Sequence, residues 1–215
     1  AISACEGSRQ WRMALALLGW LPSLRIAADT VLCNAAIRAC DCGGQWQVAL
    51  DLFGQFDSLR LVPDIVSYNS VLDAVFDRPA GCDLFREAVE RRIYPPLLAY
   101  YGHLLDLHEL SVGAAVIAVQ VLFSQVRAGR AAGADVLRGL RIVTGWGRSR
   151  DEWDRGGAGV ADAVQQLLTV LGVPSVPAKG SWLVRTRDVL FPAMAASPGQ
   201  PQEARRHRQT ETRRQ

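Results

Sequence analysis

The sequence predicts an α-helical solenoid built from helical hairpins, followed by a small α/β domain with the element order βαβαββ. Two observations carry this prediction. The first 96 residues contain an internal repeat with a period of 35 residues. Beyond them, strand-like segments alternate with helical periodicity, which is typical of α/β domains. We place the helical part at 1–96, the α/β part at 97–192 and a basic, disordered tail at 193–215.

The repeat is visible as identical residues that recur 35 positions apart. The matches are Ala1–Cys5 with Ala36–Cys40 (four of five residues), Gln10-Trp11 with Gln45-Trp46, Ala14-Leu15 with Ala49-Leu50, and Asn34 with Asn69. A period of this length made of two amphipathic helices is typical of solenoids, in which each hairpin buries its apolar face against the next. The register gives a partial repeat at 1–29, a complete one at 30–64 and a shortened one at 65–96.

Prolines predict where the shortened repeat turns and where it ends. Pro79 and Gly81 flank Ala80, and this tripeptide predicts the turn between the two helices of the hairpin. Pro95 and Pro96 exclude helix continuation, so the boundary between the helical part and the α/β part is expected between Tyr94 and Tyr101.

Two predicted strand ends carry the polar motifs of the α/β part. A strand at Leu105–His108 puts Asp106 and His108 on one side, because successive side chains of a strand alternate. A strand at Leu140–Val143 delivers Thr144, Gly145, Trp146 and Gly147 at its carboxyl end, where open α/β sheets place ligands. The two motifs are therefore expected to converge.

Helices and further strands complete the predicted domain. The helix between the two motifs shows one apolar stripe with helical spacing: Val112, Ala115, Val116, Val119, Leu122, Phe123 and Val126. A second amphipathic helix is predicted at Gly159–Leu171. Val173–Val189 then predicts a loop, a short strand and a closing strand.

Composition is that of a globular protein, with 49% hydrophobic and 21% charged residues. The net charge is +3, and residues 199–215 hold five arginines against two glutamates, so the folded part is close to neutral. Nucleic-acid binding therefore cannot be argued from bulk charge. The odd count of five cysteines argues against a disulfide framework and favours a reducing compartment. No run approaches the ~18 apolar residues that suggest a membrane span, and the start at Ala1 inside a repeat indicates a fragment.

The repeat resembles the pentatricopeptide repeat (PPR), as seen in Asn34-Ala35-Ala36-Ile37, Ala49-Leu50-Asp51-Leu52-Phe53 and the ending Leu61-Val62-Pro63-Asp64. PPR proteins bind single-stranded RNA with one base per repeat. The resemblance implies base selection by Asn34 with Asp64, a pairing that favours uracil, and by Asn69, although Pro96 replaces the polar partner there. An amide suits this task because it offers a donor and an acceptor together. The alternative is that Asn34 and Asn69 cap helices.

The order LDLH, helix, strand, TGWG and second helix resembles the small MutS-related (Smr) domain, a nucleic-acid-cleaving module. The resemblance implies catalytic roles for Asp106, His108, Thr144, Gly145 and Gly147. Many members have Gly after the His, whereas this chain has Glu109.

The residue types at this motif suit phosphodiester cleavage. His108 can carry a proton near neutral pH, and Asp106 can orient the imidazole or accept a proton. Gly145 and Gly147 permit close approach of backbone N–H groups to a phosphate. Two further residues are nucleic-acid-binding candidates: Trp146 could stack on a base and Arg148 could bind phosphate. The same residues have plainer interpretations, as an exposed Asp-x-His pair, a glycine turn and a core tryptophan.

Together the resemblances imply RNA binding by PPR repeats coupled to endonucleolytic cleavage by the Smr domain. The alternatives are a non-catalytic RNA-binding adapter and a helical scaffold for a protein partner. Single-stranded RNA is the expected partner, with DNA left open at the Smr domain and no membrane. No metal ligand set is recognisable in Asp106, His108 and Glu109, although a Mg²⁺ requirement stays open. Members of these families often work in chloroplasts or mitochondria, so the resemblance implies one of these two locations for this protein.

Overall fold

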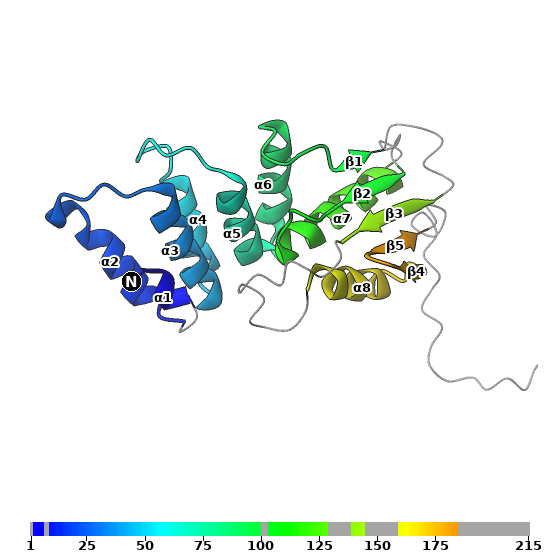
Figure 1. The fold of residues 1–215 in the computed structure, drawn as a ribbon, viewed down its shortest axis with the longest axis horizontal. Helices are drawn as coiled ribbons and strands as arrows, with labels where there is room; N and C mark the ends of the chain where they lie inside the picture. Colours follow the sequence, from blue (N-terminus) through cyan, green and yellow to red (C-terminus); the bar gives the residue numbers. More distant parts are fainter. Residues whose placement is uncertain (1, 7–8, 100–102, 129–138, 145–158, 185–215) are drawn as a thin grey trace, which may run out of the picture.

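The computed structural model describes residues 2–6, 9–99, 103–128, 139–144 and 159–184. Within these residues six α-helices lead into a part with two more helices and a five-stranded mixed sheet (Figure 1). The expected order, helices followed by an α/β part, is confirmed. None of the described helices is both long and apolar enough to cross a membrane.

Three helical hairpins make up the helical part. They are α1 (Ile2–Glu6) with α2 (Trp11–Trp20), α3 (Thr30–Cys42) with α4 (Trp46–Gly54), and α5 (Ile65–Val75) with α6 (Pro79–Glu90). A short 3₁₀ helix, Pro22–Leu24, follows α2. The first helices of successive hairpins pack on one another, α1 on α3 and α3 on α5. Fully buried side chains of these hairpins include Ile37, Phe56 and Tyr68.

Aspartates begin the first helices of the second and third hairpins. Asp29 is the N-cap of α3 and accepts a hydrogen bond from the backbone N–H of Leu32 at 2.7 Å. Asp64 is the N-cap of α5 and accepts one from the N–H of Ser67 at 2.8 Å, while the Ser67 hydroxyl accepts from the N–H of Asp64. These caps satisfy N–H groups that have no partner within the helix. The two aspartates lie 35 residues apart, which accounts for part of the repeat.

An arginine with a left-handed backbone ends each hairpin. Arg25, Arg60 and Arg92 have φ angles of 57°, 56° and 56°. For a residue with a Cβ this conformation costs roughly 1 kcal/mol. The compensation is a helix-ending hydrogen bond by the next residue, such as the one from the N–H of Leu61 to the carbonyl of Phe56 at 2.8 Å.

The predicted turn at Pro79, Ala80 and Gly81 is wrong, because these residues form the first turn of α6. Proline suits the first helical position, where its missing N–H has no partner to lose. Gly81 permits close packing of α6 on its neighbours. A Cβ there would lie 2.7 Å from the carbonyl oxygen of Val75 and 2.9 Å from Cδ1 of Ile117.

The sheet has the order β1-β2-β3-β5-β4. Its strands are β1 (Leu98–Ala99), β2 (Leu104–Asp106), β3 (Leu140–Val143), β4 (Ser175–Ala178) and β5 (Ser181–Val184). β2 and β3 are parallel and the other pairs are antiparallel. The short strand β1 was not predicted; the other four strands and two helices follow the expected order βαβαββ.

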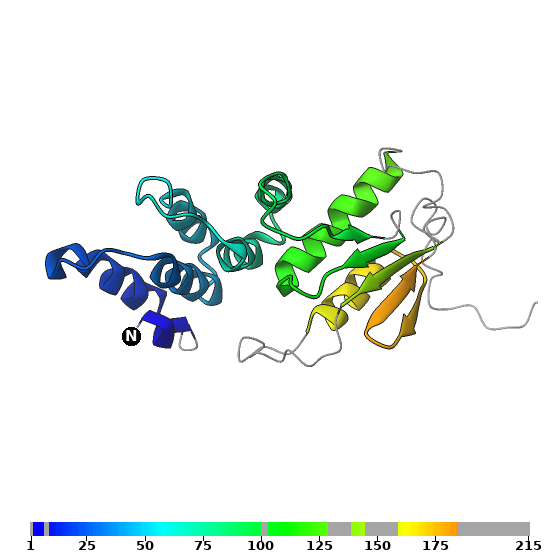
Figure 2. The same cartoon turned by 45° about the horizontal axis from the view of Figure 1, so that its top comes forward.

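Helices α7 (Val112–Arg127) and α8 (Val160–Val170) lie together on one side of the sheet (Figure 2). Strand side chains alternate accordingly: Leu105 and Ile142 are buried, while Arg141 is exposed. This alternation is expected for a sheet covered by helices on one face.

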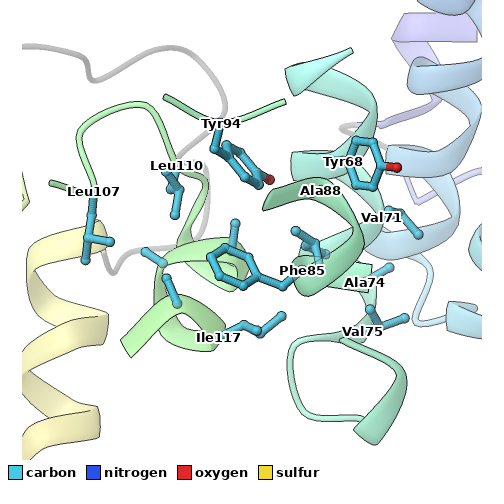
Figure 3. Close-up of a cluster of buried hydrophobic side chains, with 14 of the residues drawn as sticks. Tyr68, Val71, Ala74, Val75, Phe85, Ala88, Tyr94, Leu107, Leu110 and Ile117 are labelled. Atoms are coloured by element: carbon cyan, nitrogen blue, oxygen red, sulfur yellow. The ribbon is translucent and has the colours of Figure 1, made fainter. Parts of the chain in front are cut away.

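Helix α7 joins the two parts of the chain. It packs against α5 and α6 as well as α8, so it is buried on more sides than the single predicted stripe. Ala114, Ile117 and Ala118 lie outside that stripe and are also buried. In Figure 3, Tyr94, Phe85, Leu110 and Ile117 belong to one apolar cluster between the last hairpin and the α/β part. The two parts therefore share a core.

Candidate functional site

Asp106 and His108 lie side by side at the carboxyl end of β2. Oδ1 of Asp106 lies 2.6 Å from Nδ1 of His108, and it also accepts the backbone N–H of His108 at 3.2 Å. The side chain of His108 is 52% exposed. Leu105 and Leu107, which alternate with them along the chain, are buried. The predicted proximity of Asp106 and His108 is confirmed.

The element that produces this proximity differs from the prediction. β2 ends at Asp106, and His108 lies in the turn that follows, not in a strand. The physical reason is that the Asp106 carboxylate accepts the N–H of His108 two residues on, as in an Asx-turn, which ends the extended conformation. Leu107 still donates its N–H to the carbonyl of Val143 at 2.8 Å, which anchors the start of the turn to β3.

A second carboxylate lies at the other edge of the imidazole. Oε1 of Glu109 is 3.4 Å from Nε2 of His108. The hydrogen bond to Asp106, assisted by the negative charges of Asp106 and Glu109, raises the pKa of His108 above its ordinary value of 6.5. A larger fraction of His108 is therefore protonated near neutral pH, which suits a proton donor.

The second motif begins beside the first. Asp106 is the register partner of Val143 in the parallel pair of β2 and β3, so Thr144 follows at the same sheet edge. Thr144 donates its N–H to the carbonyl of Gly180 at 3.1 Å and is half-buried. The remaining residues of this motif, Gly145, Trp146, Gly147 and Arg148, lie outside the described residues.

The described residues do not fit a Mg²⁺ ion at this turn. Asp106 contacts Nδ1 and Glu109 contacts Nε2, so the ring of His108 separates the two carboxylates that a hard cation would have to share. Across the described part of the chain, no three His, Cys, Asp or Glu side chains are grouped so as to hold a metal.

Asn34 is a buried residue of the second hairpin, at 3% exposure, and contacts the start of the next hairpin. It is the fifth residue of α3, and its Nδ2 donates to Oδ1 of Asp64 at a long 3.4 Å. Its Oδ1 is buried and has no hydrogen-bond partner among the described residues. Asp64 itself is exposed. The capping interpretation of Asn34 is wrong, because Asp29 caps α3.

Two valines near these positions were missed by the sequence analysis. Val31 and Val66 are the second residues of α3 and α5, three residues before Asn34 and Asn69, and they are 70% and 40% exposed. Residues three apart share a helix face. The 35-residue repeat of an apolar residue at a helix start was the signal that could have identified them.

Asn69 has different surroundings from Asn34, although it occupies the same position of α5. Its Nδ2 donates to the carbonyl of Glu109 at 3.1 Å, and its Oδ1 accepts from the hydroxyl of Tyr94 at 2.9 Å. Capping is excluded here too, because Asp64 is the N-cap of α5. Both polar atoms of this amide are thus engaged at the junction with the α/β part.

No family model matches the chain, and no curated protein matches it in sequence.

Proposed function

We propose that the chain binds single-stranded RNA through PPR-type hairpins arranged as a solenoid and cleaves it with an Smr-type α/β domain. The observation that carries this proposal is the Asp106–His108 pair, held at 2.6 Å and half exposed at the sheet edge where the glycine-rich motif begins. The Asn34–Asp64 contact on the hairpins supports the RNA-binding half.

Uracil is the proposed base because its edge presents an acceptor, a donor and an acceptor. Nδ2 of Asn34 can donate to a uracil oxygen by giving up its 3.4 Å contact with Asp64, which is near the limit for a hydrogen bond. An exposed Asp64 carboxylate can accept the imide N–H. Val31 and Val66, exposed in the first turns of α3 and α5, offer apolar surfaces for the faces of the base.

Base recognition is tested by comparing the two aspartate caps. Asp64→Ala and Asp29→Ala each remove an N-cap, at a cost of roughly 1 kcal/mol. Of these two caps, Asp64 is the one that hydrogen-bonds to Asn34. Asp64→Ala and Asn34→Ala should therefore abolish the preference for a uridine over a cytidine at one position, while Asp29→Ala should retain this preference. Competition binding with RNAs that differ at single positions measures this. Equal preference in all variants would argue against RNA recognition by the hairpins.

His108 is the proposed proton donor for cleavage. Attack of the ribose 2′-hydroxyl on phosphorus breaks the bond to the 5′-oxygen, and the imidazolium donates its Nε2 proton to that leaving oxygen. The 2′-hydroxyl proton passes to a carboxylate of the same turn. Glu109 is the candidate, because a bound phosphate can displace its long 3.4 Å contact with Nε2, whereas Asp106 stays bound to Nδ1 at 2.6 Å. Asp106 orients the ring and stabilises its charged form.

The whole chain with a labelled, uridine-containing RNA tests cleavage, with EDTA and with Mg²⁺. We expect cleavage in EDTA, abolished by His108→Ala and reduced on the order of 10²-fold or more by Asp106→Asn, with RNA affinity kept in both. Cleavage that survives His108→Ala would refute the assignment.

A non-catalytic RNA-binding adapter is the second candidate, and Glu109 favours it. The carboxylate covers Nε2 of His108 and adds negative charge where a phosphate would have to approach. RNA binding without cleavage, unchanged by Asp106→Asn and His108→Ala, would identify the adapter.

A further inference from the structure

The turn that carries His108 is fastened to the last hairpin at two points, one helical turn apart on α5. At the first point, Asn69 donates to the carbonyl of Glu109 at 3.1 Å. At the second, Asp73 Oδ1 accepts the N–H of Gly113 at 2.7 Å. Asn69 and Asp73 are four residues apart, so they lie on the same face of the helix. Residues 109–113 are therefore held along α5 at both ends.

Further contacts fix the orientation of the Asn69 amide. Tyr94 donates its hydroxyl to Oδ1 of Asn69 at 2.9 Å, which directs Nδ2 toward Glu109. Tyr94 is 5% exposed and stacks on Phe85 at 5.7 Å between ring centroids. The hydroxyl of Ser111 donates to the backbone carbonyl of Asn69 at 3.3 Å. The amide is thus held by a buried, well-packed partner.

Asn34 provides an internal comparison 35 residues earlier. Each asparagine is the fifth residue of its helix. The Oδ1 of Asn34 has no hydrogen-bond partner among the described residues, and its Nδ2 makes only the long contact with Asp64. Both polar atoms of Asn69 have short partners instead. The same residue at the same repeat position therefore has spare hydrogen-bonding capacity in one hairpin and a structural task in the next.

We propose that Asn69 is a positioning residue for the Asp106–His108 pair and not a base-recognising residue. Nδ2 of Asn69 binds the carbonyl of Glu109, the residue after His108. This hydrogen bond restrains the turn in which Nδ1 of His108 lies 2.6 Å from Asp106. The last hairpin thereby acts as part of the site in the α/β domain. The catalytic half of this inference rests on the proposed function, whereas the effect on His108 does not.

The test that is independent of RNA is an NMR titration of the His108 imidazole in the whole chain. Asn69→Ala releases the carbonyl of Glu109, so the contact with Asp106 becomes less populated and the pKa of His108 should fall toward 6.5. Asn34→Ala is the matched control and should leave the His108 titration unchanged, because the side chain of Asn34 hydrogen-bonds to Asp64, the cap of the next hairpin, and not to the turn of His108. Tyr94→Phe keeps the ring packing and should give a smaller shift in the same direction.

The second test uses RNA. Asn69→Ala should leave the preference for each base unchanged and should lower kcat about 10- to 100-fold with little change in KM, as expected for a displaced catalytic group. Asn34→Ala should instead remove the preference for a uridine at one position.

The inference is overturned if Asn69→Ala and Tyr94→Phe both leave the His108 titration as in the wild type, or if Asn69→Ala removes selectivity at one nucleotide. A chain that neither binds nor cleaves RNA would defeat the proposed function alone, because the titration needs no RNA. If Asn69→Ala does not fold, the Tyr94→Phe titration decides.

Discussion

Gly113 lies where α7 meets α5, and replacing it with alanine tests how closely the two parts are packed. A Cβ at this position would lie 2.7 Å from both Cα and Oδ1 of Asp73, and 2.8 Å from the carbonyl oxygen of Leu72. Two of these atoms belong to the α5 backbone, so they cannot move aside cheaply. Overpacking of this kind costs about 1–3 kcal/mol, and weakening the 2.7 Å hydrogen bond from Gly113 to Asp73 costs about 1 kcal/mol more.

Helix propensity acts in the opposite direction. Alanine is favoured over glycine inside a helix by about 1 kcal/mol, so the net destabilisation by Gly113→Ala should be about 1–3 kcal/mol. Gly19 is the matched control, because it lies in α2 and a Cβ there would meet no atom within 4 Å. Gly19→Ala should therefore stabilise the protein by up to about 1 kcal/mol.

Urea unfolding followed by circular dichroism measures both variants, and the transition midpoint should fall for Gly113→Ala and rise for Gly19→Ala. A shift of the His108 resonances in Gly113→Ala is also expected, because Gly113 is the second residue of α7, which follows directly on the turn of the site. If Gly113→Ala were as stable as the wild type, the close packing of α7 on α5 would be refuted.

Two further predictions concern charge. Burial raises the pKa of Asp73 to about 6 from 3.8, so the folded state retains a proton that the unfolded state releases, and stability should fall as pH rises from about 4 to about 6. Asp73→Asn keeps an oxygen acceptor for Gly113 but does not titrate, so its stability in urea unfolding should not fall over this pH range. At pH 7 the variant should be up to about 3 kcal/mol more stable than the wild type. Equal pH dependence of stability in both proteins would contradict this prediction. Glu109→Gln removes one of the two charges beside His108, so the pKa of His108 in an NMR titration should fall and RNA affinity should rise, and an unchanged titration would show that Glu109 does not act on the ring.

The hairpins were predictable because their packing needs recur along the chain. Each first helix must bury one face on its neighbour and needs an N-cap, so residues such as Asp29 and Asp64 reappear at the same spacing. Pro79 was misinterpreted because proline suits both a turn and the first position of a helix. Only the packing of α6 on α5 and α7, which Gly81 permits, selects the helix.

The proximity of Asp106 and His108 was also predictable, because it depends on local geometry. Residues two apart in an extended segment share a side, and an Asx-turn likewise brings a carboxylate to the residue two positions on. The choice between strand and turn was decided by the hydrogen bond from the N–H of His108 to Asp106. Strand alternation by itself does not predict that bond.

The sequence by itself determined the order of helices and strands, the repeat, and the pairing of a carboxylate with an imidazole, because each depends on residues close together in the chain or on a regular period. The tertiary structure alone decided what Asn69 and Asp73 do. Their partners Tyr94, Glu109 and Gly113 lie 25 to 40 residues away. Asn34 and Asn69 are identical in the sequence, and only the packing of Tyr94 and of the α/β part against α5 gives both polar atoms of the second one a short hydrogen bond.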